Sequence, residues 1–542
     1  MAQSYINANL HDVEDVEYEK DINADAGTET SPRVSQAMNS VPTPHHTKYL
    51  YSHTQHLRQI VSLTGPIIVS EIFQNTLPIT DIAFVGRLTS KEDLAAAALA
   101  TVWFNLWNST MLGFCTAVDT LLSQSYGAQE MEAFAIWTGN SLFIVSLVSF
   151  IVAGLLALCE PMMVVFGQDP TLASAAGQFS YRLLPGLLPY YIFKVLVKHL
   201  QTQNIVLPGA LIGLFANGFN IFANWFFISY LSMGLNGAPI ATSFTRCIEL
   251  VMVVIYFYWK KTQKKTYEIE KDGDNYDSSN PNQGQSHDRF LQTWPIFSSR
   301  NLNCDIIMTF LKMATHSALS FTAEAWSFEI TTILAGLLGT VALDAHIITL
   351  SIATFIYLSF PFAIGVATSI RVGQLIGEGK ALEAKRSSLV SFLFTFLVQG
   401  VLIVILIIPT TGKTMGVLFS SDNGVSDLTA TLIPLSCIFM LGDAIQSNAG
   451  GVLRGLGRQK LLFVLNVIGF WVLALPCGAL LTFGLEGIGV AGLWWGMTIG
   501  IYSSSFLGLL LLKCYVDWDH EAKKAQDRIA VTSASDNNTM SG

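Results

Sequence analysis

Long apolar runs separated by short polar segments dominate the chain. Runs of roughly 20 residues, the length that spans the hydrocarbon core of a bilayer, recur from about Leu57 to Leu512 in this chain of 542 residues. The run from Ser141 to Cys159, SLFIVSLVSFIVAGLLALC, does not alternate apolar and polar residues, as the short strands of a membrane barrel would. The pattern therefore predicts about twelve transmembrane helices. They begin near Leu57, Leu94, Trp137, Ala175, Ile205, Ala238, Phe310, Leu343, Ser387, Leu428, Leu461 and Ile488.

The composition agrees with a polytopic membrane protein. Apolar residues make up 51% of the chain and charged residues only 13%, whereas soluble domains carry about 25% charged residues. We therefore expect an all-α integral membrane protein whose surroundings are the lipid bilayer, without a nucleic-acid partner.

The distribution of charge predicts the orientation. Residues 1–50 are polar, include the acidic run DVEDVEYEKD from Asp12 and contain no signal-peptide core, so they are expected to form a disordered cytoplasmic tail. Lys194 and Lys198 flank the turn between spans four and five, KKTQKK from Lys260 follows span six, and Arg454 begins the connection between spans ten and eleven. By the positive-inside rule, both termini are cytoplasmic.

An internal repeat divides the chain into two halves. GLNGAPIA from Gly234 aligns with GLEGIGVA from Gly484 at an offset of 250 positions, and other residues align at the same offset. These pairs are Gly86 with Gly336, Gln124 with Gln374, and Gly127 with Gly377. Two six-helix lobes follow, at 51–259 and 306–513, related as parallel repeats. The linker at 260–305 is expected to be disordered, with a regulatory role as the alternative, and 514–542 to be a cytoplasmic tail.

Two glutamates interrupt an apolar run in the second half. Glu324 and Glu329, in EAWSFEITTILAGLLG, are five positions apart, so their side chains diverge by about 140° around a helix. If Glu324 faces a central cavity, Glu329 faces a neighbouring helix of its own half. Burial disfavours the charged form of a carboxyl, so such a group can take up and release a proton. The alternative is a carboxyl satisfied by polar neighbours as part of the packing.

The repeat places Gln74 at the position that corresponds to Glu324. We therefore expect the uptake and release of protons mainly in the second half, and we expect Gln74 to line the same cavity and to form hydrogen bonds there. Asp443 is the third acid inside a span, and the two Glu and Asp443 are the candidate proton-coupling residues. Asp81 and Asp119 are further candidates for the substrate cavity, although a cap or a structural hydrogen bond is the preferred interpretation for both.

Aromatic rings attract organic cations, and Trp326 and Tyr357 are the candidates for this role. The alternative is that they pack in the core or anchor the helices at the membrane interface. The seven cysteines are scattered singly, and the chain contains no phosphate-binding GxxxxGK[ST] loop and no metal-ligand motif. No enzyme activity, cofactor or metal is therefore expected.

Five stretches resemble the multidrug and toxic compound extrusion (MATE) transporters, specifically the eukaryotic branch. They are VDTLLSQSYGAQ, QTQNIVLPGALIGLFANGFNIFANW, EAWSFEITTILAGLLG, GVATSIRVGQLIGEGKALEAKR and SNAGGVLRGLGRQKLLFVLN, and the resemblance extends from about Tyr51 to Leu512. It implies two six-helix lobes around a V-shaped central cavity, and export of organic, often cationic compounds in exchange for protons or sodium.

The resemblance also implies roles for individual residues. Glu324 and Asp443 match proton-coupling carboxylates of the seventh and tenth helices of the family. Glu329 matches a second family glutamate, and Tyr357 matches an aromatic position of the eighth helix. Two positions depart from the family pattern. Ser351 stands where some animal members have a glutamate, and Gln374 replaces the asparagine that usually follows RVG.

The sequence thus predicts a monomeric, proton-coupled exporter of small organic compounds that works by alternating access in the plasma membrane or the vacuolar membrane. The alternatives are a sodium-coupled exporter, an exporter of organic anions such as siderophores, and a flippase for lipids or lipid-linked saccharides. A flippase is expected to have a more cationic cavity than the few Lys and Arg expected inside the spans would provide.

Overall fold

The computed structural model describes residues 51–271, 290, 292–295, 304–408, 414, 416–417, 422–484 and 487–534. Contacts divide the chain into Met1–Tyr49 and Leu50–Gly542, and the second unit contains all the elements below. The described residues form helices and no strands. The predicted disorder of residues 1–50 and of most of the linker lies outside the described residues.

The described part of the first half contains seven helices and two short helical segments. The helices are α2 (His53–Leu88), α3 (Lys91–Gly127), α4 (Met131–Ala157), α5 (Cys159–Val165), α6 (Pro170–Thr202), α7 (Leu207–Asn224) and α8 (Gly237–Lys271), with η1 (Trp225–Tyr230) and η2 (Gly234–Asn236) between α7 and α8. Helix α8 extends beyond the predicted start of the linker at residue 260.

The second half repeats this order and adds a final helix. Its elements are α10 (Cys304–Gly336), α11 (Thr340–Ser359), α12 (Pro361–Gly377), α13 (Ala381–Ile407), α15 (Asn423–Gly455), α16 (Gln459–Asn466), η4 (Val467–Ala474), α17 (Leu475–Phe483), α18 (Val490–Cys514) and α19 (Trp518–Ala534). Pro361 separates α11 from α12 because its ring cannot continue the preceding helix.

Eight of the described helical segments are long and apolar enough to cross a membrane. Helices α2, α3, α6 and α10 are at least as long as several of these, but their sequences are more polar. They carry most of the intramembrane Glu, Asp, Gln and Lys residues described below, whereas Glu249 lies on α8 and Asp443 on α15. Together with the eight, they give the predicted twelve membrane helices in two lobes.

Close contacts between equivalent residues confirm the internal repeat. A Cβ placed on Gly127 would lie 2.0 Å from the carbonyl oxygen of Gln374, and a Cβ on Gly377 would lie 2.0 Å from that of Gln124. Each contact is therefore the counterpart of the other across a pseudo-two-fold axis. Glycine is needed at both positions because any side chain would overlap the opposite half.

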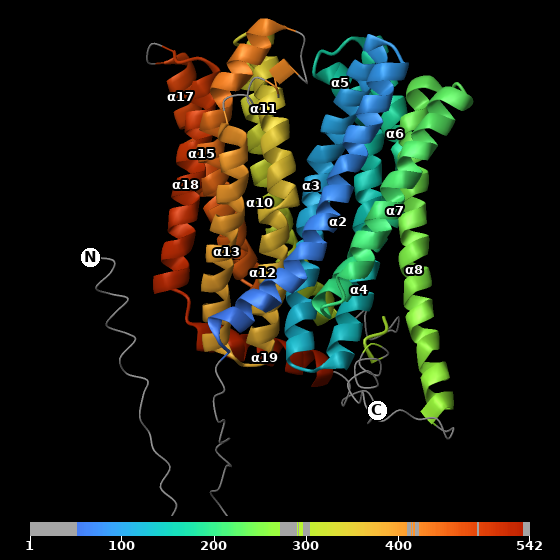
Figure 1. Ribbon diagram of the computed structural model, residues 1–542, viewed down its shortest axis with the longest axis vertical. Coiled ribbons are helices and arrows are strands. Elements are labelled where there is room, and N and C mark those ends of the chain that lie inside the picture. Colours follow the sequence, from blue (N-terminus) through green and yellow to red (C-terminus); the bar gives the residue numbers. More distant parts are fainter. Residues whose placement is uncertain are drawn as a thin grey trace, which may run out of the picture. The chain divides into compact units, whose positions relative to one another are not determined.

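The first helix of each half packs against the other half. Helix α2 contacts α11, α12 and α13 of the second half as well as α7, while α10 contacts α3 of the first half. Figure 1 shows α2 crossing obliquely from α13 toward α7. At the beginning of α2, the buried His56 Nε2 lies 2.9 Å from Glu383 Oε2 on α13.

The contacts that join the halves gather toward the end of the bundle where α19 lies, here called the α19 end; the opposite end is the α5 end (Figure 1). The side-chain amide of Gln124 donates to the Gly455 carbonyl at 2.8 Å, and that of Gln374 to the Thr202 carbonyl at 2.9 Å. In this conformation the bundle is therefore held together at the α19 end.

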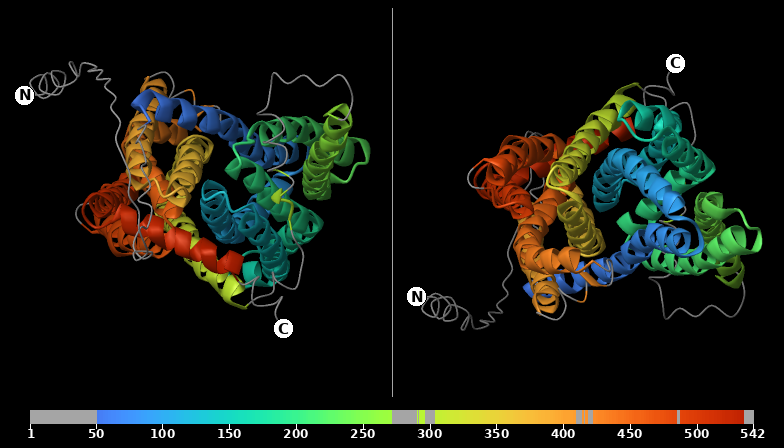
Figure 2. Two further views of the ribbon diagram at one scale, coloured as in Figure 1. Left: turned by 90° about the horizontal axis from the view of Figure 1, so that it is seen from below. Right: turned by 90° about the horizontal axis from the view of Figure 1, so that it is seen from above.

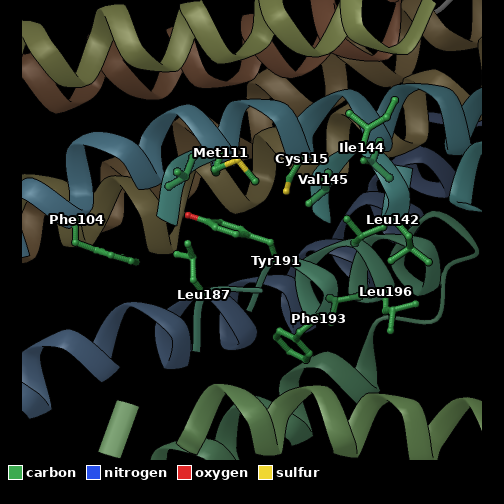
Figure 3. Close-up of a cluster of buried hydrophobic side chains, with 14 of the residues drawn as sticks. Phe104, Met111, Cys115, Leu142, Ile144, Val145, Leu187, Tyr191, Phe193 and Leu196 are labelled. Atoms are coloured by element: carbon green, nitrogen blue, oxygen red, sulfur yellow. The ribbon is translucent and has the colours of Figure 1, made fainter. Parts of the chain in front are cut away.

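A dense apolar core fixes the helices of the first half. Figure 3 shows Tyr191 among Met111, Cys115 and Leu187, side chains that are almost completely buried. The Tyr191 hydroxyl donates a hydrogen bond to Asn108 Oδ1 at 3.0 Å. This core holds α6 firmly against α3, which determines where the lysines of α6 lie.

Candidate functional site

Glu324 points into the second half. Its carboxylate accepts a hydrogen bond from Asn466 Nδ2 at 3.3 Å, and the same nitrogen lies 3.0 Å from Ser320 Oγ, one turn earlier on α10. Tyr357 of α11 also hydrogen-bonds to the Glu324 carboxyl. Gln446 Nε2 donates to Asn466 Oδ1 at 2.7 Å, which fixes the orientation of the asparagine amide. Glu324 is thus a partly buried carboxyl with oriented donors.

Asp443 of α15 lies within electrostatic reach of Glu324 and is only 5% exposed. Two carboxylates in such surroundings repel each other when both are ionised. The structure therefore brings together Glu324, Asp443 and Tyr357, three of the residues that the sequence singled out. A proton or a cation between the carboxyls would relieve their repulsion.

Arg454 adds a positive charge to this group that the sequence did not predict. It was expected in a connection between spans, but it lies in the last turn of α15 and is buried, with its guanidinium 5.8 Å from the centre of the Phe321 ring. It interacts electrostatically with Glu324 and with Asp119 of the first half. Its Nε and Nη2 are buried without a hydrogen-bond partner, so its charge is available to both halves.

Glu329 and Trp326 do not lie beside the Glu324 carboxyl. Thr322 hydrogen-bonds to Thr110 of α3 at 2.8 Å, and Glu329, seven positions further, falls on nearly the same face of α10. The expectation that Glu329 would face its own half while Glu324 faced a central cavity is therefore reversed. Trp326, 37% exposed, is about 200° around the helix from Glu324.

In the first half, Gln74 is bound to a carboxylate. Its Nε2 donates to Glu249 Oε1 of α8 at 2.5 Å, and Glu249 is fully buried. The first half therefore also has a carboxyl beside the position that corresponds to Glu324, a residue that the sequence analysis did not identify. The signal that could have revealed Glu249 is an acid inside the sixth apolar run, one turn after Arg246.

Two lysines expected beside a turn are buried inside the protein. Lys198 Nζ lies 2.5 Å from Asp119 Oδ2, and Lys194 Nζ lies 3.7 Å from Glu71 Oε2. Helix α6 extends to Thr202, so both lysines belong to its last turns, and long aliphatic stems allow lysine to be buried in this way. The expectation that few cations lie inside the spans is corrected by these residues.

Asp81 and Asp119 make structural bonds and cap no helix. Asp81 Oδ1 accepts from Asn224 Nδ2 at 2.7 Å and from Asn220 Nδ2 at 3.3 Å, and its Oδ2 accepts from the Thr242 hydroxyl. Both carboxylates are thus engaged in bonds between helices, Asp119 with Lys198 and Asp81 with two asparagines and a threonine.

A small cavity lies between the two halves next to this charge network. The first half contributes Ser70, Glu71, Gln74, Leu112, Phe193, Lys194, Val197, Lys198 and Gln201, and the second half contributes Phe362 and Val366 of α12. The cavity joins charged groups of the first half to an apolar wall of the second. In the described ranges, no three His, Cys, Asp or Glu side chains gather closely enough to hold a metal ion.

The comparisons with known proteins agree with this architecture. The MatE family model matches residues 66–226 and 317–480, one segment in each half. The multidrug and toxin extrusion protein 1 of Xenopus tropicalis is 29% identical over 479 residues, 88% of this chain and 77% of that protein. The rat protein of the same name is 30% identical over 446 residues, 82% of this chain and 73% of that protein.

Solved structures share the fold. The eukaryotic MATE transporter AtDTX14 superimposes with a TM-score of 0.78 at 24% identity, covering 88% of this chain and 99% of that chain. The Vibrio cholerae MATE transporter VcmN in its bent form gives 0.69 at 16% identity, covering 89% and 99%. Since the family model matches both halves and the fold agrees, this chain belongs to the MatE family of multi-pass membrane transporters.

Proposed function

We propose that this transporter exports organic cations in exchange for protons, with Glu324 and Asp443 as the carboxyls that exchange the proton for the cation. The observation that carries the proposal is that the partly buried Glu324 and the buried Asp443 lie within electrostatic reach of each other, with Tyr357 and Asn466 as donors to Glu324. A site of this kind favours one added positive charge.

Competition for that site is sufficient to couple the two fluxes. Ionised Glu324 and Asp443 hold an organic cation, and protonation removes the charge that holds it. Arg454 offsets part of the negative charge of Glu324 and Asp443, so one additional positive charge, from a proton or an organic cation, is enough to neutralise the two carboxylates. Each ligand shifts the conformational equilibrium by its different affinity for the two states.

The direction of transport follows from the orientation. Lys260, Lys261, Lys380 and Arg386 all lie toward the α19 end, which we therefore assign to the cytoplasm, with both chain termini. The conformation described here, joined at the α19 end, is then the one closed to the cytoplasm. Protons that enter from the α5 end would displace the exported compound in this state.

The test is uphill transport of radiolabelled tetraethylammonium in proteoliposomes with an imposed pH gradient and no sodium. We expect transport by the wild type and a loss of at least tenfold, about 1.4 kcal/mol of coupling, in Glu324→Gln and Asp443→Asn. Glu92→Gln, an exposed substitution at the start of α3, is the matched control and keeps the wild-type rate. Glu329→Gln is expected to slow transport without uncoupling it, because Glu329 lies on another face of α10.

Other outcomes would select another function. Transport that depends on a sodium gradient and persists without a proton gradient would show that sodium, and not the proton, is the coupling ion. The two buried lysines beside the inter-half cavity favour an exporter of organic anions as the second candidate. Transport of a dicarboxylate, lost in Lys194→Met, together with no movement of tetraethylammonium, would support that candidate and overturn the first.

A further inference from the structure

Helix α19, in the segment expected to be a plain tail, is amphipathic. Its buried residues recur at intervals of three and four, and its exposed residues are mostly charged. The buried ones include Trp518, Glu521, Ala522, Ala525 and Ile529, and the exposed ones include Asp519, Lys523, Lys524 and Asp527. Its 17 residues extend over about 25 Å, enough to reach from one half of the bundle to the other.

The first turns of α19 pack on the second half. Trp518, Ala522 and Ala525 belong to an apolar cluster with Leu375 of α12 and Ala384 of α13. An ion pair joins the buried Glu521 to Arg458, between α15 and α16. These contacts fix the beginning of α19 to the second half.

The last turns of α19 pack on the first half. Ile529 belongs to the apolar cluster of that half, and the helix contacts both α3 and α4. Arg528 Nη1 donates to Gln124 Oε1 at 2.7 Å, while Gln124 itself donates to the Gly455 carbonyl of the second half at 2.8 Å. Arg528 therefore bonds to the residue that joins the two halves, and Figure 2 shows α19 crossing the end of the bundle.

The surface that binds α19 exists as a whole only while the two halves meet at the α19 end. Separation of α3 from α12 would remove either the Ile529 and Arg528 contacts or the Trp518 and Glu521 contacts. We propose that α19 is a strap that stabilises the conformation closed at this end, and that its last turns must leave the first half before that end opens. The exposed charged face keeps the strap in water and allows it to detach.

Hydrogen–deuterium exchange of the purified full-length protein tests the strap. The variant Arg528→Ala/Ile529→Ala removes the contacts with the first half and leaves the Trp518, Ala522 and Ala525 packing and the Glu521–Arg458 ion pair with the second half. We expect roughly tenfold faster amide exchange in residues 118–128 and 368–378, which the closed conformation covers. Lys523→Ala/Lys524→Ala, on the exposed face of the same helix, is the matched control and leaves exchange there unchanged.

The pattern along the chain separates the strap from general destabilisation. Faster exchange confined to the α19 end supports the strap. Unchanged exchange in both segments, or an equal increase across all helices with a lower unfolding temperature, overturns it. Slower exchange at residues 159–166, at the α5 end, is also expected, but this part rests on the alternating access of the proposed function. Its absence, with faster exchange at the α19 end, would count against alternating access and leave the strap standing.

Discussion

The side-chain amide of Gln74 lies 2.5 Å from the carboxylate of the fully buried Glu249, and this bond joins the first and last long helices of the first half. The second carboxylate oxygen of Glu249 is buried without a partner. The Gln74 amide is therefore the hydrogen-bond donor to a carboxylate that water does not reach.

Gln74→Ala is expected to destabilise the protein by about 1–3 kcal/mol, the cost of leaving a buried carboxylate without its donor. The measurement is the midpoint of thermal unfolding in detergent, followed by size-exclusion chromatography. Gln168→Ala, at an exposed position, serves as the control and should change stability by less than about 0.5 kcal/mol. Equal midpoints for the two variants would show that the Gln74–Glu249 bond contributes nothing.

The buried Lys198–Asp119 pair gives a second prediction about stability. Lys198→Met leaves the Asp119 carboxylate without its cation in an apolar environment and is expected to cost about 3–5 kcal/mol. Lys198→Met/Asp119→Asn removes both charges and should recover a large part of that loss. A double mutant no more stable than Lys198→Met would contradict an interaction between the two charges.

The membrane helices and the correspondence between the two halves were predictable from the sequence. The contacts among the buried charged residues were not. Each apolar run is long enough to cross the hydrocarbon core of a membrane as a helix, so the length of the runs alone reveals the spans. The 250-residue offset likewise pairs Gly127 with Gly377 from the residue letters alone. The partners of Glu249 and Lys198 lie 175 and 79 positions away, and no local pattern identifies them.

The face of each helix was only partly predictable. The divergence of Glu324 from Glu329 follows from helix geometry, but the half that each faces depends on neighbouring helices, and the expectation was reversed. Arg454 was assigned to a connection because span ends cannot be located to the last turn from composition. The spacing of Trp518, Ala522, Ala525 and Ile529, at intervals of three and four, is typical of an amphipathic helix, so α19 could have been predicted from the sequence.

Arg454→Gln is expected to move the pH dependence of transport toward alkaline pH. The positive charge near Glu324 favours the ionised carboxyl, so without it ionisation requires a higher pH. The limb of the profile that depends on ionised Glu324 and Asp443 should therefore shift upward. Tetraethylammonium binding measured across a pH series checks this, and Arg454→Lys, which keeps the charge, should stay closer to the wild type. A reduced amplitude with no shift would indicate that Arg454 acts through packing alone.

Gly127→Ala and Gly377→Ala are expected to prevent closure at the α19 end. The added methyl group would lie 2.0 Å from a carbonyl oxygen of the other half, a distance that requires α3 and α12 to move apart. Both variants should therefore lose most transport and show faster hydrogen–deuterium exchange in residues 118–128 and 368–378. Gly154→Ala is the control, because nothing lies within 4 Å of its added Cβ. Similar results at positions 127 and 377 follow from the pseudo-two-fold relationship of their contacts. Normal transport in either variant would mean that the contact between Gly127 and Gln374, or its counterpart, is not required for the cycle.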